Sequence, residues 1–528
     1  MSTTLTGSAT EAELEAIIAR TALKYDLLPY TSNPFPQTQP ARLGAIARLF
    51  GVEPKPLANA RVLELGCAAG GNIIPLAIQY PEAEFVGVDL SRTQVAGGRA
   101  RITKLGLNNV VIHCKSFTEL TEDDGKFDYI ICHGVYSWVP AQVRDAILEI
   151  CRRHLADEGV ALISYNVLPG WRMMQALRDA FLLYVPDHND SRQRVAQARA
   201  LLGILKQYSP ETGAYKQILS GWADRLANLP DDYIAHEFLE EINDPCTFKQ
   251  FVDSAARHNL TFLAEADLPS MVLDNQPAET AAKIREITGN QIIASEQMLD
   301  ILNGRTFRQT MLVKAEIGAK IDRNVTTQRI GPLHVITGGD IAVQRTDKGA
   351  VAKDSAGRTL TTENKAVVAA VEKLAATHPA SIRVDDLVDD GTSETDREIV
   401  RETILRLALS GMCTILSESV PAASAAPKKP VAIPLARADA KNGETFTTNL
   451  RHERITYDAL AQFVLPHLDG SRDLAAITDL VVDAARTGRL NFEMNGARVT
   501  DPSQQSAIAA EQVKTLAQSL ARTALLQG

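Results

Sequence analysis

Apolar and polar positions alternate regularly over residues 61–166. Short apolar runs, typical of strands buried on both faces of a parallel sheet, predict strands at 61–66, 84–89, 109–115, 127–132 and 159–165. The segments between them space their apolar residues as helices do, which predicts helices at 72–80, 91–105 and 140–155. Strands that alternate with helices indicate an α/β fold with a doubly wound, Rossmann-like parallel sheet.

Two further strands are predicted beyond this region, at LTFLAEA (260–266) and FRQTMLVKA (307–315), with helical patterns before and between them. We infer that they complete the same sheet, which then has seven strands. One domain would cover residues 41–320 and contain a helical insertion at 167–304. The alternative is that the two strands belong to a separate small domain.

The two ends of the chain have other patterns. Helical periodicity at Glu11–Tyr25, followed by three prolines within residues 25–37, predicts an N-terminal helix and lid over residues 1–40. Helical patterns at Asn364–Thr377 and Glu394–Leu409, followed by an apolar run, predict a winged-helix-like unit. Beyond residue 320 we therefore expect a winged-helix-like domain at 321–420, an Ala-, Pro- and Lys-rich linker at 421–445, and a mainly helical domain at 446–528.

The stretch RVLELGCAAGGN, residues 61–72, reads as strand, glycine turn and helix. Gly66, Gly70 and Gly71 allow backbone to approach a ligand closely, and Asn72 can cap the helix that follows. No GK[ST] follows, so this is not a P-loop, and its E-x-G-x-x-x-G-x-N pattern differs from the dinucleotide fingerprint. The turn is therefore a ligand-binding candidate of another kind.

Two carboxylates narrow the choice of ligand. Glu64 precedes the glycine turn, where it would repel a pyrophosphate and attract an ammonium group. Asp89 ends the next strand, where it can accept hydrogen bonds from both hydroxyls of a ribose. An amine together with a ribose, without a phosphate, indicates S-adenosylmethionine (SAM). The alternative is an ordinary strand–helix turn with two surface acids.

Polar and aromatic residues follow the other predicted strands. Ser116 and Phe117 could hold an adenine, or could form a strand-end turn with a core phenylalanine. The loop ICHGVYSWVP (131–140) carries aromatic faces that attract a sulfonium or an ammonium. Tyr165 and Asn166 offer acceptors to a nucleophile's N–H, or merely cap the sheet edge. The candidate catalytic residues are Tyr136, Tyr165, Asn166 and, from the lid, Asp26, which could close over the site together with Tyr30.

Composition limits the class of protein further. The 528 residues are 45% hydrophobic and 23% charged, which is ordinary for a globular protein, and a net charge of −9 argues against nucleic-acid binding. Six cysteines without a C-x-x-C pair indicate a reducing compartment and no metal site. There is no signal-peptide pattern, and no apolar run approaches 18 residues. We therefore expect a cytoplasmic protein without membrane insertion.

The motifs ELGCAAGGN, FVGVDLS, ICHGVYSWVP and SYNVLPGW together resemble class I SAM-dependent methyltransferases that carry a methyltransferase regulatory domain. Rickettsial protein lysine methyltransferases are the described members that the chain resembles. HEFLEEIND, FKQF and AARHNLTFLAEA are similar to the regulatory region, and TNLRHERITYDALAQFVLPHLDG is similar to the C-terminal winged-helix region. The candidate cofactor-binding residues are Glu64, Gly66, Cys67, Gly70, Asn72, Asp89, Leu90, Ser116, Phe117 and His133.

The resemblance implies SAM as cofactor, a homodimer, and protein lysine as one acceptor. The leading hypothesis is methyl transfer from SAM to an amine of a protein docked on the C-terminal region. A small-molecule N- or O-methyltransferase is the second hypothesis. A SAM-binding regulatory or scaffold protein is the third.

Overall fold

The computed structural model describes residues 11–186, 190–210, 212–494 and 497–528, so the first ten residues of the predicted N-terminal segment lie outside it. The chain divides into two compact units. The first unit contains the described residues of 1–32, 60–73 and 84–321, and the second contains those of 33–59, 74–83 and 322–528. Each unit is described by itself.

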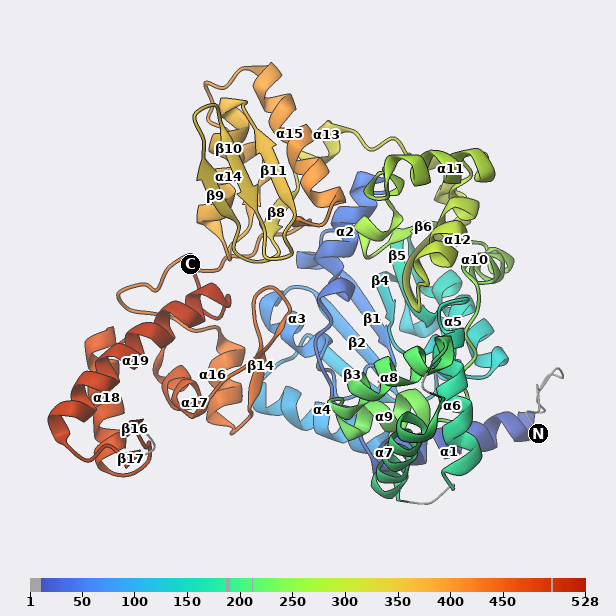
Figure 1. Ribbon diagram of the computed structural model, residues 1–528, viewed down its shortest axis with the longest axis horizontal. Helices are drawn as coiled ribbons and strands as arrows, with labels where there is room; N and C mark the ends of the chain where they lie inside the picture. The colour runs from blue at the N-terminus through green and yellow to red at the C-terminus, as the bar shows by residue number, and fades with distance from the viewer. Residues whose placement is uncertain (1–10, 187–189, 211, 495–496) are drawn as a thin grey trace. The chain divides into compact units, whose positions relative to one another are not determined.

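A seven-stranded sheet forms the centre of the first unit, in the order β3-β2-β1-β4-β5-β7-β6 (Figure 1). Only β7 runs antiparallel to its neighbours in this sheet. The strands are β1 (Arg61–Leu65), β2 (Glu84–Asp89), β3 (Val110–Cys114), β4 (Phe127–Cys132), β5 (Leu155–Asn166), β6 (Leu260–Glu265) and β7 (Phe307–Lys314). The predicted doubly wound sheet is confirmed, including the two late strands at its edge.

The strand order reverses beside β1, and a crevice is expected at such a point. The chain goes from β1 outward to β2 and β3, and then returns to the other side of β1 with β4. The connections that follow β1 and β4 therefore leave in opposite directions. Ligands bind in such sheets between the carboxyl ends of two strands of this kind. The residues after these two strands begin at Gly66 and His133.

Local signals in the sequence set the helix ends around the sheet. Ser91 caps α4 by accepting a hydrogen bond from Gln94 N, and Gly106 ends the helix with a φ of 67°. The helices of this unit are α1 (Glu11–Leu27), α4 (Arg92–Leu105), α5 (Ala141–His154), α6 (Arg172–Tyr184), α7 (Ser191–Tyr208), α8 (Ala214–Ala227), α9 (Asp231–Phe238), α10 (Phe248–Arg257), α11 (Ala278–Thr288) and α12 (Ile292–Asn303). Helix α3 (Ile73–Gln79) follows the glycine turn and, from residue 74 on, belongs to the second unit.

Two apolar clusters can be followed within the described residues of the first unit. One packs the sheet against α5 and α10 and includes Ile130, Ile147 and Phe251. The other joins α6 to α9 around Phe181 and Phe238 and has no strand residue, in agreement with the predicted helical insertion. Figure 1 shows these four helices, in teal and green, gathered next to one another.

The second unit has small sheets covered by helices. Its elements are α2 (Pro40–Leu49), α13 (Thr327–Ile330), β8 (His334–Thr337), β9 (Ala342–Arg345), β10 (Ala350–Lys353), β11 (Thr359–Thr362), α14 (Lys365–Thr377), β12 (Ile382–Arg383), α15 (Glu394–Leu409), β13 (Cys413–Leu416), α16 (Pro434–Lys441), β14 (Phe446–Thr448), β15 (Arg454–Thr456), α17 (Ala459–Val464), α18 (Leu474–Arg486), β16 (Glu493–Met494), β17 (Ala497–Arg498) and α19 (Pro502–Arg522). The order α14, a short 3-10 turn, α15 and β13 is the predicted winged-helix order.

Two features of this unit differ from the expected division of the chain. Helix α2, expected at the start of the sheet domain, belongs here because nearly all its apolar residues are buried and Ser417 N, just after β13, donates to Ala41 O at 2.8 Å. Residues 421–445, expected to be a linker, contain α16, whose Leu435 and Ala436 are buried. The backbone N–H groups of Ala432 and Ile433 donate to carbonyls elsewhere in the unit, and both side chains are buried. This stretch is therefore packed into the unit, not a free linker.

No helix among the described residues is long and apolar enough to cross a membrane.

Candidate active site

The glycine turn after β1 folds tightly at the crevice. Gly66 has a φ of 77° and its N–H donates to Val88 O at 2.8 Å, while Gly70, with a φ of 73°, donates to Cys67 O at 2.8 Å. A Cβ at Gly66 would lie 2.5 Å from the Val135 side chain. Glycine is therefore required there by both conformation and space. Cys67 is buried in the turn, and burial raises the pKa of its thiol.

Asp89, at the end of β2, is bonded to the same turn. Its Oδ2 accepts from Ala68 N at 2.8 Å and its Oδ1 from Ser91 N at 2.9 Å. Burial raises the pKa of this carboxyl above its ordinary value, although the backbone hydrogen bonds oppose that shift. Each carboxylate oxygen can accept a second hydrogen bond, so the pair can still receive two ribose hydroxyls. Leu90, next to it, is half-buried.

Glu64 is the least satisfied group of the turn. Only 4% of its surface is exposed, and its Oε1 accepts from Asn72 Nδ2 at 2.8 Å. Its Oε2 is buried and has no hydrogen-bond partner among the described residues. Burial raises the pKa of Glu64 to about 8. An incoming ammonium group would donate to this oxygen, so the carboxylate acceptors of the turn fit the amine and ribose of SAM.

The N-terminal segment contacts this turn and the helix after β2. Gly71 N donates to Ser32 Oγ at 2.7 Å, and Tyr30 O accepts from Gln94 Nε2 at 2.7 Å. Asp26 has a different role from the predicted catalytic one, because its Oδ1 accepts from Ser91 Oγ at 2.6 Å and from Thr93 N at 3.0 Å. Burial opposes ionisation, but these hydrogen bonds outweigh it and lower the pKa of Asp26. The carboxylate fastens α1 to the start of α4.

The predicted adenine-binding pair lies beside the turn. Phe117 is buried, and its ring edge would be 4.0 Å from a Cβ at Gly66. Ser116 caps a short 3-10 turn and its N–H donates to Glu119 Oε1 at 2.6 Å. His133, after β4, packs edge-on against Phe307 at 5.8 Å between ring centroids. Burial lowers the pKa of His133 to about 4, so its ring is neutral at pH 7.

Two predicted catalytic tyrosines belong to the core. Tyr165 is 1% exposed, stacks on Phe251 at 4.1 Å, and shares a hydrogen bond of 3.0 Å between its hydroxyl and Thr310 Oγ1. Tyr136 is also buried and packs edge-on against Phe251 at 5.3 Å. Burial raises the pKa of both hydroxyls. The hydroxyl of Tyr165 is already paired inside the sheet, so the predicted contact with a methyl acceptor stays a prediction that this hydrogen bond does not favour.

Asn166 differs from these tyrosines. It is 2% exposed, its backbone N donates to Ser137 Oγ at 2.9 Å, and its side-chain Nδ2 is buried without a hydrogen-bond partner among the described residues. Asn243 Nδ2 and Oδ1 and Trp171 Nε1 are buried and unpaired in the same way. The loops carrying these groups are bonded together, because Asp244 N donates to Ser137 O at 2.8 Å.

The structure thus brings the loops that carry the unpaired groups of Asn166 and Asn243 together, through Ser137, at the ends of β4 and β5. An unpaired buried polar group costs about 1–3 kcal/mol, so several together indicate a place for a ligand. Sequence reasoning missed Ser32, Ser137 and Asn243. Ser137 lies within the aromatic loop 131–140, which the sequence had already marked as a candidate. Asn243 follows a charged helix, and no local sequence pattern marks it as a site residue.

Three known families match parts of the chain. "Methyltransferase domain" matches residues 62–159, and "Predicted methyltransferase regulatory domain" matches residues 230–314. "PKMT, C-terminal winged helix domain" matches residues 428–525, a range that begins inside the expected linker.

Relatives cover nearly all of the chain. An uncharacterized protein of Rickettsia prowazekii (strain Madrid E) is 33% identical over 502 residues, which are 91% of this chain and 89% of the relative. The structure of PKMT2 from Rickettsia typhi in complex with AdoHcy is 28% identical, with a TM-score of 0.83, and covers 95% of this chain and 100% of that one. The chain belongs to the class I SAM-dependent methyltransferases that carry a methyltransferase regulatory domain.

Proposed function

We propose that this SAM-dependent methyltransferase transfers the methyl group to an amine nitrogen, that of a lysine side chain in a protein. The observation that carries the proposal is the set of unpaired buried groups Asn166 Nδ2, Asn243 Nδ2 and Oδ1, and Trp171 Nε1. Donors and an acceptor together suit a polypeptide, whose carbonyls accept and whose amine donates. The similarity to PKMT2 from Rickettsia typhi over almost the whole chain supports the same acceptor class.

Aromatic faces next to these groups suit a cationic side chain. Trp138 and Trp171 pack edge-on with 6.4 Å between ring centroids, and Trp138 is only half-buried. An ammonium group is attracted to such faces. The indole rings can therefore bind the lysine while Asn166 and Asn243 orient it.

SAM supplies a methyl group on a positively charged sulfur, with its own leaving group. Glu64 and Asp89 would hold the ligand's amine and ribose, and the acceptor amine must lose one proton before the transfer. A lysine has a pKa near 10.4, so roughly one in a thousand is neutral at about pH 7.4. His133 is a weak base because burial lowers its pKa to about 4, and Asp26 is occupied by Ser91 and Thr93. The proton therefore leaves to solvent before transfer, and the rate rises with pH between about 7 and 9.

The experiment is methylation of a cell extract by the full-length protein with isotope-labelled SAM, followed by peptide mass spectrometry. We expect label on lysine nitrogen. The Asp89→Ala variant is the matched control for labelling by other enzymes of the extract. Label only on oxygen or carbon, or only in small metabolites, would contradict the proposed acceptor. Tight SAM binding without any transfer would favour a regulatory or scaffold protein.

We further propose that the protein acceptor docks on the C-terminal region and that the enzyme is a homodimer. Cross-linking of the full-length chain to an acceptor found as above should give cross-links to residues 446–528. Sedimentation equilibrium should give twice the mass of one chain. Cross-links confined to other segments, or a single-chain mass at all concentrations, would contradict these two proposals separately.

A further inference from the structure

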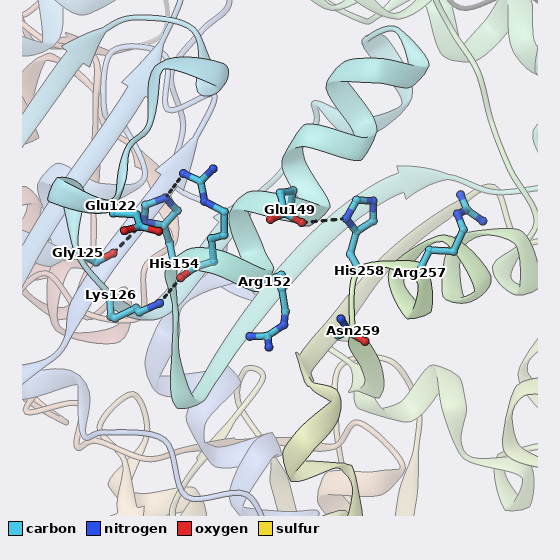
Figure 2. Close-up of a pocket in the computed structure, with 10 residues that line it drawn as sticks. Glu122, Gly125, Lys126, Glu149, Arg152, His154, Arg257, His258 and Asn259 are labelled. Carbon is cyan, nitrogen blue, oxygen red and sulfur yellow. Dashed lines mark hydrogen bonds and ion pairs between the residues drawn. The ribbon is translucent and has the colours of Figure 1, made fainter.

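A cavity of about 670 Å³ lies away from the crevice, at the edge of the sheet where the parallel strands begin. Its walls are the residues before β4, the last turn of α5, and the end of α10 (Figure 2). Gly125 and Lys126 precede β4, His154 precedes β5, and Asn259 precedes β6. The SAM-binding turn follows the other end of β1, so the two sites occupy opposite edges of one sheet.

The cavity is basic although the chain carries a net charge of −9. Lys126, Arg152, Arg153 and Arg257 line it, against the carboxylates of Glu122 and Glu149. Arg152 is paired with Glu316 at 2.6 Å. Figure 2 shows Glu149 facing His258, at 3.2 Å between Oε2 and Nδ1.

Three of the cations have no carboxylate within ion-pair distance among the described residues. Lys126 Nζ donates to the backbone carbonyl of Arg153, and Arg153 Nη2 donates to Leu120 O at 3.1 Å. Arg257 Nη2 donates to Ser254 Oγ at 3.0 Å. Each is bonded to a neutral oxygen and retains donors for an anion.

Basic residues in the last turn of a helix also complement its dipole, and Arg153 and Arg257 could have that purpose alone. Lys126 lies outside any helix, immediately before β4, and yet points to the same cavity. The two helix ends also converge on one hollow, where three uncompensated cations repel one another. A purely structural role would favour separating them.

The two helices connect this cavity with the acceptor end of the sheet. Helix α5 begins just after the loop of Tyr136–Trp138, and α10 begins after Cys246, whose N–H donates to Asn166 O at 3.3 Å. His258 at the end of α10 reaches Glu149 of α5, so the helices are neighbours. A 14-residue helix is about 20 Å long, which places the cavity about 20 Å from the unpaired groups of the acceptor site.

We propose that the cavity binds an acidic segment, rich in Asp and Glu, of the polypeptide that is methylated. The identification of this polypeptide as the methylated substrate rests on the proposed function. An extended chain advances about 3.3 Å per residue, so at least about six residues separate the acidic segment from the lysine. The segment would hold the substrate at one edge of the sheet while its amine reaches the other.

The test is fluorescence anisotropy of a labelled peptide with eight consecutive glutamates, titrated with the full-length protein. We expect binding that weakens as salt is raised, since the cations are exposed. The double variant Arg153→Glu, Arg257→Glu should bind at least tenfold more weakly. The charge-preserving variant Arg153→Lys, Arg257→Lys should stay within about threefold of the wild type.

The matched control is Lys104→Glu with Arg192→Glu, which makes the same change in net charge at exposed positions of α4 and α7. It should bind the peptide as the wild type does. SAM titration of each variant checks that the sheet is folded. Failure of the wild type to bind the peptide, or an equal loss in the control pair, would overturn the proposal.

A labelled oligonucleotide of matched charge distinguishes the other class of polyanion. Tighter binding of the oligonucleotide, lost in the Arg153→Glu, Arg257→Glu variant, would overturn the acidic-peptide reading. None of these measurements requires methyl transfer. Their failure therefore leaves the proposed function standing, and a failed methylation assay leaves the binding result standing.

Discussion

The candidate active site has two halves, one around β1 and β2 and one around β4 and β5, which differ in how many of their buried polar groups are hydrogen-bonded. Around β1 and β2 the polar groups are nearly all paired: Asp89 accepts two backbone N–H groups, and Glu64 Oε2 is the buried exception. Around β4 and β5 the donors of Asn166, Asn243 and Trp171 lack partners among the described residues. The first half is preorganised for one constant ligand, whereas the second retains unmet hydrogen-bonding capacity. A SAM site can be shared by many enzymes, but an acceptor site must be left open for its own substrate.

The largest expected effect tests the rigidity of the cofactor half. A Cβ at Gly71 would lie 2.3 Å from Ser32 O, so Gly71→Ala must displace either the turn or the segment over it. We expect a loss of SAM affinity of about 100-fold, since overpacking costs about 1–3 kcal/mol and the turn shapes the site. Titration calorimetry measures it. Gly97→Ala, with nothing within 4 Å of the new Cβ, is the control and should be silent.

Removing the ribose acceptor should have the next largest effect. Asp89→Ala should weaken SAM binding by about 10- to 100-fold, or roughly 1.5–3 kcal/mol, because two hydroxyls and two backbone donors lose a charged partner. Titration calorimetry again measures SAM affinity, and Asp123→Ala, which removes an exposed carboxylate, is the control. Equal affinities of wild type and Asp89→Ala would remove this residue from the site.

The pH dependence of SAM binding tests the unpaired carboxyl. With a pKa of about 8, Glu64 is protonated at pH 5–7 and must lose its proton to pair with an ammonium. SAM affinity should therefore rise with pH over this range, by at most about tenfold per pH unit. Glu64→Gln cannot titrate and should show a flat profile. A wild-type profile that matches the glutamine variant would contradict the assignment.

The raised pKa of Glu64 also affects the stability of the fold, which falls as pH rises while SAM affinity increases. A carboxyl whose folded pKa lies above its unfolded value favours the folded state at low pH. That contribution disappears as pH rises from about 4.5 through about 8. Glu64→Gln should therefore be more stable than the wild type at pH 9 and close to it at pH 4. Chemical denaturation at the two pH values measures this difference.

Asn166 is the residue with which the acceptor half of the candidate site can be tested. If Asn166 binds the acceptor and not the cofactor, as we propose, Asn166→Ala should lower turnover about tenfold and leave SAM affinity within about twofold. It should not lower the free energy of unfolding, since the Nδ2 group that it removes is buried and has no hydrogen-bond partner among the described residues. A large loss of stability would show that Asn166 is structural.

The smallest expected effect comes from Tyr165→Phe. Its hydroxyl bonds Thr310 inside the sheet, so losing it should cost about 0.5–1.5 kcal/mol of stability and leave turnover nearly unchanged. Thermal or denaturant unfolding measures the first, and the methylation assay the second. A tenfold loss of turnover without loss of stability would restore the catalytic role that the sequence predicts.

The sequence predicts the cofactor half because that half is local. Glu64, the glycines and Asp89 lie within 26 residues, and their roles follow from strand ends and turn chemistry. The seven strands follow likewise from short apolar runs. The acceptor half joins residues about 100 positions apart, such as Ser137 and Asn243, which no local pattern connects.

Two predicted catalytic residues show a second limit. Asp26 and Tyr165 have the chemistry of an active site, but their polar atoms are already bonded to Ser91, Thr93 and Thr310. A sequence gives the residue type and, through periodicity, the face on which it lies. It does not tell which hydrogen bonds the fold has already used.

The burial of α2 has a consequence for how the chain is made. Its carbonyl at Ala41 bonds Ser417, and its apolar faces are covered within the second unit. At about 5–20 residues per second, the ribosome needs roughly 20–75 s to synthesise the residues between them. During that interval α2 emerges with most of its apolar surface exposed and its partner strand not yet made. The nascent chain therefore completes the packing of α2 only after residue 417 has been synthesised.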